Sequence, residues 1–380
     1  MSVGLRNRQI DMIRGVAILL VLLHHFNIAY RLDDTSLAGV FGWDAVRAVA
    51  RNGNYGVTMF FVVSGYLITS NAERRWAGLA NIGVRAFYNL RVARILPCLV
   101  LLLAVVNLLA VGGVTIFQNR PQGGEPVSFW LVNFASLTFW MNVLIGRHGW
   151  FNYPLGVLWS LSVEEVFYLS FPLLCLLLRH KARLLAFWAV VIVAGPLYRF
   201  ASQGDEGGYL YAYLASFDGI AIGCCTALLA RRVALHGPAA RVWQGVVVMM
   251  MAAFYLWRPI GQTNVLGVTG MAFGTAVLLL GAAGQPTGKV RRGVSPLTML
   301  GWLGRLSYEL YLFHLLVLGI MRTAFPPRAV TGDVKLLLLV AFLALSAGLA
   351  ALVSRFYAEP LNHRIRLLGP TGAGTPRAAT

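Results

Sequence analysis

Long apolar runs separated by short basic loops constrain this chain more than any other feature. They lie near residues 12–30, 55–70, 95–112, 128–145, 158–178, 184–199, 208–230, 242–257, 264–283, 298–320 and 335–357. Lipid offers backbone groups no hydrogen-bond partner, so a run of about 20 apolar residues crosses a bilayer as an α-helix. Only 12% of the 380 residues are charged, about half the fraction that is usual in a globular protein. The sequence therefore predicts an all-α, polytopic membrane helix bundle embedded in the lipid bilayer.

The basic residues of the loops predict how these runs are threaded. Short cytoplasmic loops of membrane proteins are enriched in arginine and lysine. If residues 128–145 do not cross the membrane, the following basic segments all fall on one side of it: 6–8, 74–94, 179–183, 231–241, 289–292 and 364–366. We therefore expect about ten transmembrane helices, both termini in the cytoplasm, and an outer re-entrant or interfacial segment at 128–145. The outer loop from about 113 to 157 could cover a substrate site.

Domain organisation and charge narrow the class further. A membrane domain should cover residues 1–366, followed by a disordered cytoplasmic tail at 367–380. The net charge of +18 would suggest nucleic-acid binding in a soluble protein, but the arginines between apolar runs fit membrane orientation better. We expect no nucleic-acid partner, and a bacterial plasma membrane as the location. The four cysteines lie in apolar runs without metal-ligand spacing, and no HExxH motif is present, so no metal site is predicted.

Polar side chains inside the first run mark the first candidate site. The stretch IDMIRGVAILLVLLHHF, residues 10–26, carries Asp11 and Arg14 near its start and the pair His24 and His25 further along. Charge inside a span is costly and usually faces the bundle interior for a functional reason. Asp11 and Arg14 are helical neighbours, whereas Arg14 and His25 share a face about 16 Å apart. Simpler interpretations stay open: Arg14 orients the span, and the histidines are buried packing groups.

A second polar cluster lies in LWSLSVEEVFYLSFP, residues 158–172. Ser160 and Glu164 are about one helical turn apart and share a face, and Glu165 follows directly. With the threading above, this run descends from the outer surface while the first run ascends, so Glu164 and His25 should reach a similar depth. We therefore expect a carboxylate to hydrogen-bond His25 and fix its tautomer. The second ring nitrogen could then take a proton from a hydroxyl group.

Further polar positions lie at helix ends and inside other runs. Arg91 and Arg94, at i and i+3 before the third predicted span, suit a phosphate or pyrophosphate, although ordinary basic flanking explains the spacing as well. Ser64, beside a glycine, is expected to serve helix packing. Four more positions are expected to line the bundle interior, with helix-to-helix hydrogen bonding as the simpler alternative: they are Asp218, Tyr311, His314 and Glu359.

Together these segments are more specific than any one of them. The order IDMIRGVAILLVLLHH, MFFVVSGYLI, LRVARILP, LWSLSVEEVFYLSFP, GRLSYELYLFH resembles the acyltransferase 3 family of integral membrane proteins over roughly residues 10 to 361. The final Glu-x-Pro element of that family is disturbed here, because Glu359 directly precedes Pro360. The family's arginine–histidine pattern falls on Arg14 and His25, and its paired arginines fall on Arg91 and Arg94. Its tryptophan-serine-glutamate element falls on Trp159, Ser160 and Glu164.

The resemblance implies transfer of an acyl group, usually acetyl, from cytoplasmic acyl-CoA to a hydroxyl group, typically of an envelope sugar. Arg91 and Arg94 would bind the CoA phosphates, and the acyl arm would pass Arg14. His25, oriented by Glu164, would activate the acceptor directly or form an acyl-histidine intermediate. We expect no fused hydrolase-like domain of the kind found in some relatives, so any second, extracytoplasmic transferase would be a separate protein. The competing hypotheses are a proton-coupled exporter of a glycan or lipid precursor and a non-catalytic assembly protein.

Overall fold

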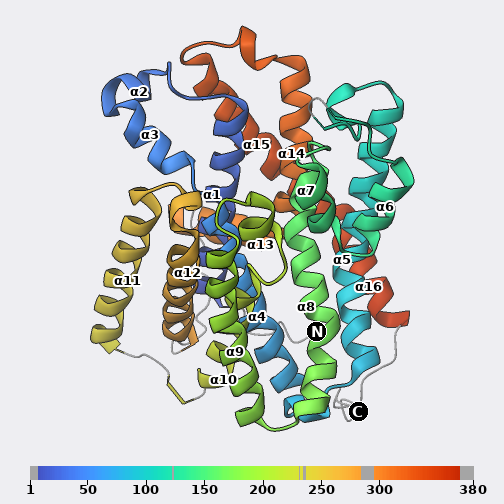
Figure 1. The fold of residues 1–380 in the computed structure, drawn as a ribbon, viewed down its shortest axis with the longest axis vertical. Helices are drawn as coiled ribbons and strands as arrows, with labels where there is room; N and C mark the ends of the chain where they lie inside the picture. Colours follow the sequence, from blue (N-terminus) through green and yellow to red (C-terminus); the bar gives the residue numbers. More distant parts are fainter. Residues whose placement is uncertain (1–6, 122–123, 231, 234–236, 284–294, 369–380) are drawn as a thin grey trace.

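Helices make up the regular structure of the ranges that the computed structural model describes, residues 7–121, 124–230, 232–233, 237–283 and 295–368 (Figure 1). Within those ranges no strand occurs, so the all-α prediction is confirmed. The predicted tail falls outside them from residue 369 onward. The helices are α1 Arg8–Ala29, α2 Ser36–Phe41, α3 Trp43–Ala50, α4 Asn54–Arg75, α5 Val84–Val111, α6 Phe129–Leu137, α7 Met141–His148, α8 Leu158–Leu178, α9 Lys181–Ala201, α10 Phe217–Leu229, α11 Gly237–Trp257, α12 Ile260–Ala283, α13 Pro296–Arg305, α14 Ser307–Ala324, α15 Val334–Val353 and α16 Glu359–Leu368, with short turns η1 Leu79–Asn81, η2 Thr115–Phe117, η3 Leu155–Val157, η4 Gly207–Tyr211, η5 Pro327–Ala329 and η6 Ser354–Ala358.

The chain is a multi-pass membrane protein. Seven helices of the described ranges are long and apolar enough to cross a bilayer, or eight if the bent pair α13–α14 counts as one span. They are α1, α5, α8 with the turn before it, α9, α11, α12 and the rod from α15 to α16. Two other predicted spans are not among them. Helix α4 has 22 residues but is not apolar enough, and α10 is apolar but has only 13 residues. Both are largely buried and pack against each other, so protein rather than lipid surrounds much of their surface.

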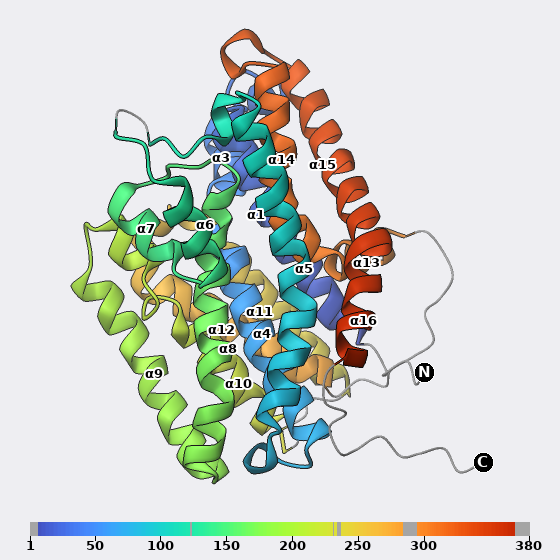
Figure 2. The same cartoon turned by 90° about the vertical axis from the view of Figure 1, so that its right-hand side faces the viewer.

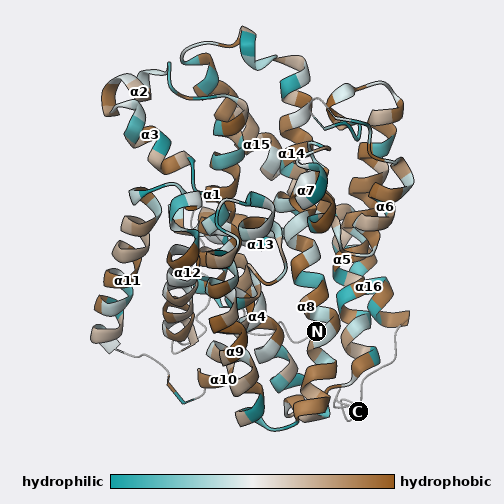
Figure 3. Ribbon diagram, viewed as in Figure 1, coloured by the Kyte–Doolittle hydropathy of each residue, from teal (hydrophilic) through white to brown (hydrophobic). Residues whose placement is uncertain are grey.

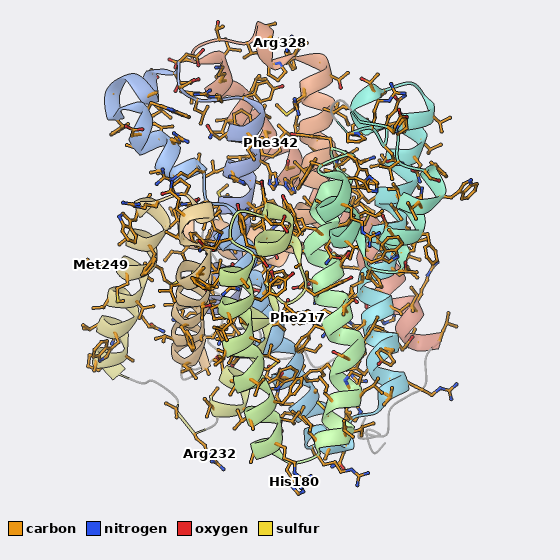
Figure 4. The ribbon with its side chains drawn as sticks, viewed as in Figure 1. His180, Phe217, Arg232, Met249, Arg328 and Phe342 are labelled. Atoms are coloured by element: carbon orange, nitrogen blue, oxygen red, sulfur yellow. The ribbon has the colours of Figure 1, made fainter. Side chains whose placement is uncertain are left out.

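The outward faces of the long helices are apolar. Hydrophobic residues cover much of the length of the outer helices, whereas hydrophilic residues are most frequent toward the ends of the bundle (Figure 3). On α11, Met249 is 73% exposed and points away from the bundle (Figure 4). Leu177 on α8 and Leu337 on α15 are 75% and 71% exposed. Exposure of this kind is a liability in water and is normal for a surface that faces lipid.

Two apolar runs do not form straight spans. Residues 128–145, which we predicted not to cross, form the short helices α6 and α7, of 9 and 8 residues. They are separated by Phe139, whose φ of 63° ends helical geometry. The run 298–320 is not the single straight helix that we expected, because α13 and α14 meet at 83° around Leu306. This bent pair fits a broken span or a re-entrant segment.

Glycines allow close contact between the backbones of α4 and α10 in the bundle core. A Cβ atom on Gly65 of α4 would lie 2.1 Å from the carbonyl oxygen of Ile220, and one on Gly223 of α10 would lie 2.1 Å from that of Val62. Only glycine permits this backbone approach. The packing role that we expected of Ser64 therefore belongs to its neighbour Gly65, and Ser64 is free to face another helix.

The bundle has two distinct ends, which Figure 2 shows in side view. At one end lie the close of α4, the start of α5 and the turn between α8 and α9, where His180 projects (Figures 2 and 4). We call this the α4–α5 end. The turn between α14 and α15, with Arg328, lies at the other end, as do α2 and α3 (Figures 1 and 4). We call this the α14–α15 end.

Candidate active site

A cationic cavity enters the bundle from the side of the α4–α5 end. It holds about 930 Å³ of empty space, its mouth included, and is lined by residues of α1, α4, α5, α8 and α14. Its cationic groups are Arg14, Arg91 and Arg94, and its carboxylate is Glu164. We call it the arginine cavity. The structure thus brings together the three arginines that the sequence singled out on two different helices.

An aromatic cavity lies toward the α14–α15 end. It holds about 1620 Å³, again with its mouth, and is lined by His24 and His25 of α1 together with Trp150, Trp159 and Tyr211. We call it the histidine cavity. Residues 115–121 and 148–153 of the predicted outer loop also contribute to its lining. Helix α1 lines both cavities, because Arg14 faces the arginine cavity and His25 faces the histidine cavity.

His314 sets the tautomer of His25. The carbonyl oxygens of Leu310 and Tyr311 lie 3.1 and 2.8 Å from Nδ1 of His314, so this nitrogen carries its proton. Nε2 of His314 must then accept a hydrogen bond, and it lies 3.2 Å from Nδ1 of His25. That Nδ1 also faces the carbonyl oxygen of Val21 at 3.0 Å. His25 therefore donates from Nδ1, and its Nε2 keeps an unshared electron pair.

The carboxylate of Glu164 has a different partner from the one we expected. Its Oε1 accepts a hydrogen bond of 2.5 Å from the Ser64 hydroxyl. The contact of His25 is with His314, so the expected pairing of Glu164 with His25 is wrong. The two side chains face different spaces, because Glu164 lines the arginine cavity and His25 lines the histidine cavity.

The paired arginines rest on aromatic rings. The guanidinium carbon of Arg91 lies 4.5 Å from the centre of the Tyr168 ring, and that of Arg94 lies 6.0 Å from the centre of the Tyr308 ring. Such stacking orients a guanidinium group without neutralising its charge. Among the described residues, no carboxylate lies within ion-pair distance of Arg91 or Arg94. Both can therefore bind an anion.

The two cavities approach each other at α8. Ser160 and Tyr311 line the arginine cavity and share a hydrogen bond of 2.6 Å. The preceding residue, Trp159, lines the histidine cavity. Tyr311 is linked to the other side as well, because its backbone carbonyl holds His314. A group that passes from one cavity to the other must therefore displace the Ser160–Tyr311 contact or slide past it.

Asp218 belongs to a separate buried cluster. Its two carboxylate oxygens accept hydrogen bonds from the Arg199 guanidinium at 3.0 and 2.7 Å, and Thr269 donates a third at 2.8 Å. Asp218 and Arg199 are both 0% exposed. Neither lines the arginine cavity or the histidine cavity. These contacts match the helix-to-helix hydrogen bonding that was the simpler alternative for this residue.

The remaining predicted residues lie around the cavities rather than between them. Nδ1 of His24 lies 3.2 Å from the carbonyl oxygen of Ala50, which holds this ring at the wall of the histidine cavity. Glu165 and Asp11 are buried, and Glu359 is exposed at the start of α16. None of these three acids lines either cavity.

Sequence reasoning missed several residues of the histidine cavity. The Trp150 ring centre lies 6.4 Å from that of His25 and 6.4 Å from that of Tyr211. Gly156 makes room for this indole, because a Cβ atom there would lie 2.0 Å from the ring. Tyr153 and Arg322 line the same cavity. The one available signal was the density of aromatic residues between 139 and 159, which periodicity does not convert into contacts.

Comparison with known proteins gives a consistent result. A family model described as an acyltransferase domain matches residues 7–355. A candidate O-acetyltransferase of Staphylococcus aureus (strain COL) is 24% identical over 372 residues, covering 92% of this chain and 56% of the relative. A candidate peptidoglycan O-acetyltransferase of Bacillus subtilis (strain 168) is 25% identical over 335 residues, covering 80% and 47%. The peptidoglycan O-acetyltransferase OatA of Listeria monocytogenes is 30% identical over 163 residues, covering 43% and 23%.

These matches cover most of this chain but only part of its relatives. The chain spans about half the length of the curated relatives it matches. No solved structure matches it. Since the family model extends over nearly the whole membrane bundle, from residue 7 to residue 355, the chain belongs to the acyltransferase 3 family.

Proposed function

We propose that this protein is a membrane O-acyltransferase that moves an acetyl group from cytoplasmic acyl-CoA to a hydroxyl group of an envelope glycan. The observation that carries the proposal is the His25–His314 pair, which leaves Nε2 of His25 unprotonated at the wall of the histidine cavity. The three arginines line the neighbouring arginine cavity. Two of the relatives are named as peptidoglycan O-acetyltransferases, which supports a glycan acceptor.

The arginine cavity suits the acyl-CoA donor. Arg91, Arg94 and Arg14 would bind its phosphates, since guanidinium groups bind phosphate oxygens through paired hydrogen bonds. The acyl-pantetheine arm would extend past the Ser160–Tyr311 contact toward His25. Glu164, held by Ser64, would border this path and repel wrongly placed phosphates.

His25 would act as the general base. Nε2 takes the proton of the acceptor hydroxyl while the oxygen attacks the thioester carbonyl. The carbon–sulfur bond then breaks, and the departing thiolate of CoA takes the proton from His25. His314 stabilises the intervening imidazolium because its Nε2 accepts a hydrogen bond from Nδ1 of His25. In the acyl-histidine variant, Nε2 attacks the thioester carbonyl, the carbon–sulfur bond breaks, and CoA leaves as the thiolate. The acceptor oxygen then attacks the acyl carbon, the bond to Nε2 breaks, and the hydroxyl proton passes to the freed Nε2 and through solvent to the CoA thiolate.

The same proposal fixes the orientation in a bacterial plasma membrane. The α4–α5 end would face the cytoplasm, where acyl-CoA is made, with about ten spans and both termini on that side. The basic residues near this end favour that orientation. The histidine cavity would then receive the acceptor from outside, or a separate extracytoplasmic transferase would take over the acetyl group there.

Ester analysis of surface glycans tests the proposal. Cells would carry the wild-type gene, a deletion, or His25→Ala at matched membrane level, and acid released by mild alkali would be quantified. We expect one ester to be lost in both mutants, and acetate as the released acid. Esters that persist in the deletion would point to a transporter, and an ester retained by His25→Ala would refute the assignment of the base.

A further inference from the structure

The histidine cavity holds an arginine that forms no ion pair with any described residue. Arg322, in the last turn of α14, lines this cavity with Arg120 and Glu206. Among the described residues, no carboxylate lies within ion-pair distance of Arg322. Its Nε atom is buried and has no hydrogen-bond partner there. A buried donor without a partner costs free energy, so its retention at a cavity wall suggests a ligand.

Tyr153 orients Arg322 without neutralising it. The guanidinium carbon lies 4.8 Å from the centre of the Tyr153 ring. Burial raises the pKa of Tyr153 to about 12, so the phenol stays protonated at neutral pH and supplies no negative charge. Burial, and after it the charge of Glu206, raises the pKa values of Tyr209 and Tyr211. The guanidinium plane is therefore held in place while its charge remains uncompensated.

The register of α14 fixes how far Arg322 lies from the reacting group. Leu315, which also lines the histidine cavity, precedes Arg322 by seven residues, so the two share a face about 10 Å apart. His314, which contacts His25, adjoins Leu315. An acceptor whose hydroxyl meets His25 can therefore reach Arg322 with a group one or two sugar units away.

Aromatic rings cover the space near the reacting group. Trp150 lies beside both His25 and Tyr211, and the Trp159 ring centre lies 5.3 Å from that of Tyr211. Such rings pack against the apolar C–H faces of sugar rings, while polar atoms at their edges form hydrogen bonds. The cavity thus combines surfaces for sugar rings with the Arg322 guanidinium group, which has a buried, unpartnered Nε and no carboxylate within ion-pair distance among the described residues.

We propose that Arg322 binds a carboxylate of the acceptor, so that the acceptor is an acidic glycan whose carboxylate lies within about a disaccharide of the acylated hydroxyl. The planar guanidinium group matches the two oxygens of a carboxylate. This inference rests on the proposed acyl transfer to a glycan and names its substrate class. Arg328 is a suitable control, because it is exposed at the same end of the bundle and does not line the cavity (Figure 4).

The first experiment identifies the ester and its neighbours in the glycan. Cells would carry the wild-type gene, a deletion, Arg322→Gln, Arg322→Lys or Arg328→Gln at matched membrane level, and the repeat unit that loses its ester in the deletion would be analysed by NMR. We expect a carboxylate on the acylated sugar or its neighbour. The ester should fall about tenfold in Arg322→Gln, fall less in Arg322→Lys and stay unchanged in Arg328→Gln.

The second experiment measures the subsite directly. Purified wild type and Arg322→Gln in proteoliposomes would transfer labelled acetyl from acetyl-CoA to the isolated glycan or to the same glycan with amidated carboxyl groups. We expect amidation to raise the acceptor KM of the wild type about tenfold, and Arg322→Gln to treat both acceptors alike with an unchanged KM for acetyl-CoA. That unchanged donor KM also shows that the variant is folded.

The outcomes separate this inference from the proposed function. A neutral or purely phosphate-bearing glycan, an ester retained in Arg322→Gln, or equal KM values for both acceptors in the wild type would overturn the carboxylate subsite and leave acyl transfer standing. If the deletion loses no ester, the proposed function itself fails, and the subsite fails with it.

Discussion

At the scale of single residues, the unusual feature is a histidine held by another histidine. A carboxylate in this position would compensate a positive charge on His25 fully. Neutral His314 compensates it only in part, but it defines the tautomer equally well, because its own Nδ1 is committed to the backbone. His25 thus has a fixed orientation and a protonation state suited to general-base catalysis at neutral pH.

The first prediction concerns His314 as a positioning residue. His314→Ala should lower kcat roughly 100-fold, because His25 then loses its tautomer and orientation, while the KM for acetyl-CoA changes little. His314→Gln should recover part of the rate, since its amide oxygen can accept a hydrogen bond from Nδ1 of His25. Steady-state kinetics in proteoliposomes measures both quantities. Equal rates for wild type and His314→Ala would rule out the role.

The second prediction concerns donor binding. Arg94→Gln or Arg91→Gln should raise the KM for acetyl-CoA about tenfold with a smaller change in kcat, as expected when one charge-assisted hydrogen bond to phosphate is lost. Arg85→Gln is the matched control, because Arg85 is exposed on the same helix and does not line the arginine cavity. If Arg85→Gln raised the KM as much as Arg94→Gln, general surface charge would explain the effect instead.

At the scale of helices, one buried ion pair ties three elements together. Arg199 of α9 bonds Asp218 of α10, and both bond Thr269 of α12. Arg199 also donates to the backbone of Ala215 and Val265. Removing one residue of such a charge pair lowers the free energy of unfolding strongly, because the remaining charge stays buried without its partner. This cluster fixes α9, α10 and α12 against one another without touching either cavity.

The third prediction separates this structural role from a proton relay. Asp218→Ala should destabilise the protein by about 3–5 kcal/mol, whereas the double variant Arg199→Met/Asp218→Leu should recover most of that loss. Thermal unfolding of the purified protein in detergent measures both. Acetyl transfer by Asp218→Ala below its melting temperature should persist. Loss of activity without loss of stability would assign Asp218 to the mechanism.

At the scale of the molecule, the proposed reaction uses one cavity for the acyl donor and the other for the acceptor. The arginine cavity and the histidine cavity open toward different ends of the bundle, and α1, α8 and α14 line both. The bent pair α13–α14 brings Ser307 and Tyr308 to one cavity and Leu315 to the other. The acetyl group therefore needs to move only the short distance around Ser160 and Tyr311.

The fourth prediction tests this arrangement across the membrane. In a variant without native cysteines, Asn71→Cys reports on the arginine cavity and Gln118→Cys on the histidine cavity. A membrane-impermeant maleimide added to intact cells should label Gln118→Cys, whereas Asn71→Cys should react only after lysis. The reverse pattern would invert the proposed orientation, and labelling of both in intact cells would contradict a cytoplasmic donor cavity.

Apolar patterning alone predicts the class of the molecule, and the polar groups beside and within the apolar runs predict most of the residues of the site. Few charges within long apolar runs leave the helix as the only available element, because lipid offers the backbone no other hydrogen-bond partner. The cost of an ionisable group within a span marks Arg14, His25 and Glu164, and the i, i+3 spacing marks Arg91 and Arg94. These residues line the two cavities.

Which of these residues meet depends on how the helices pack. The partner of His25 is His314, 289 positions away in the chain, and no periodicity reports such a contact. The break between α13 and α14 depends on packing that hydropathy does not describe. Arg322, in the last turn of α14, and Trp150, in the loop before α8, meet at the histidine cavity, which no sequence pattern reports. Apolar patterning specifies which face of a helix is buried, but rotation and depth of each helix follow from side-chain packing against its neighbours.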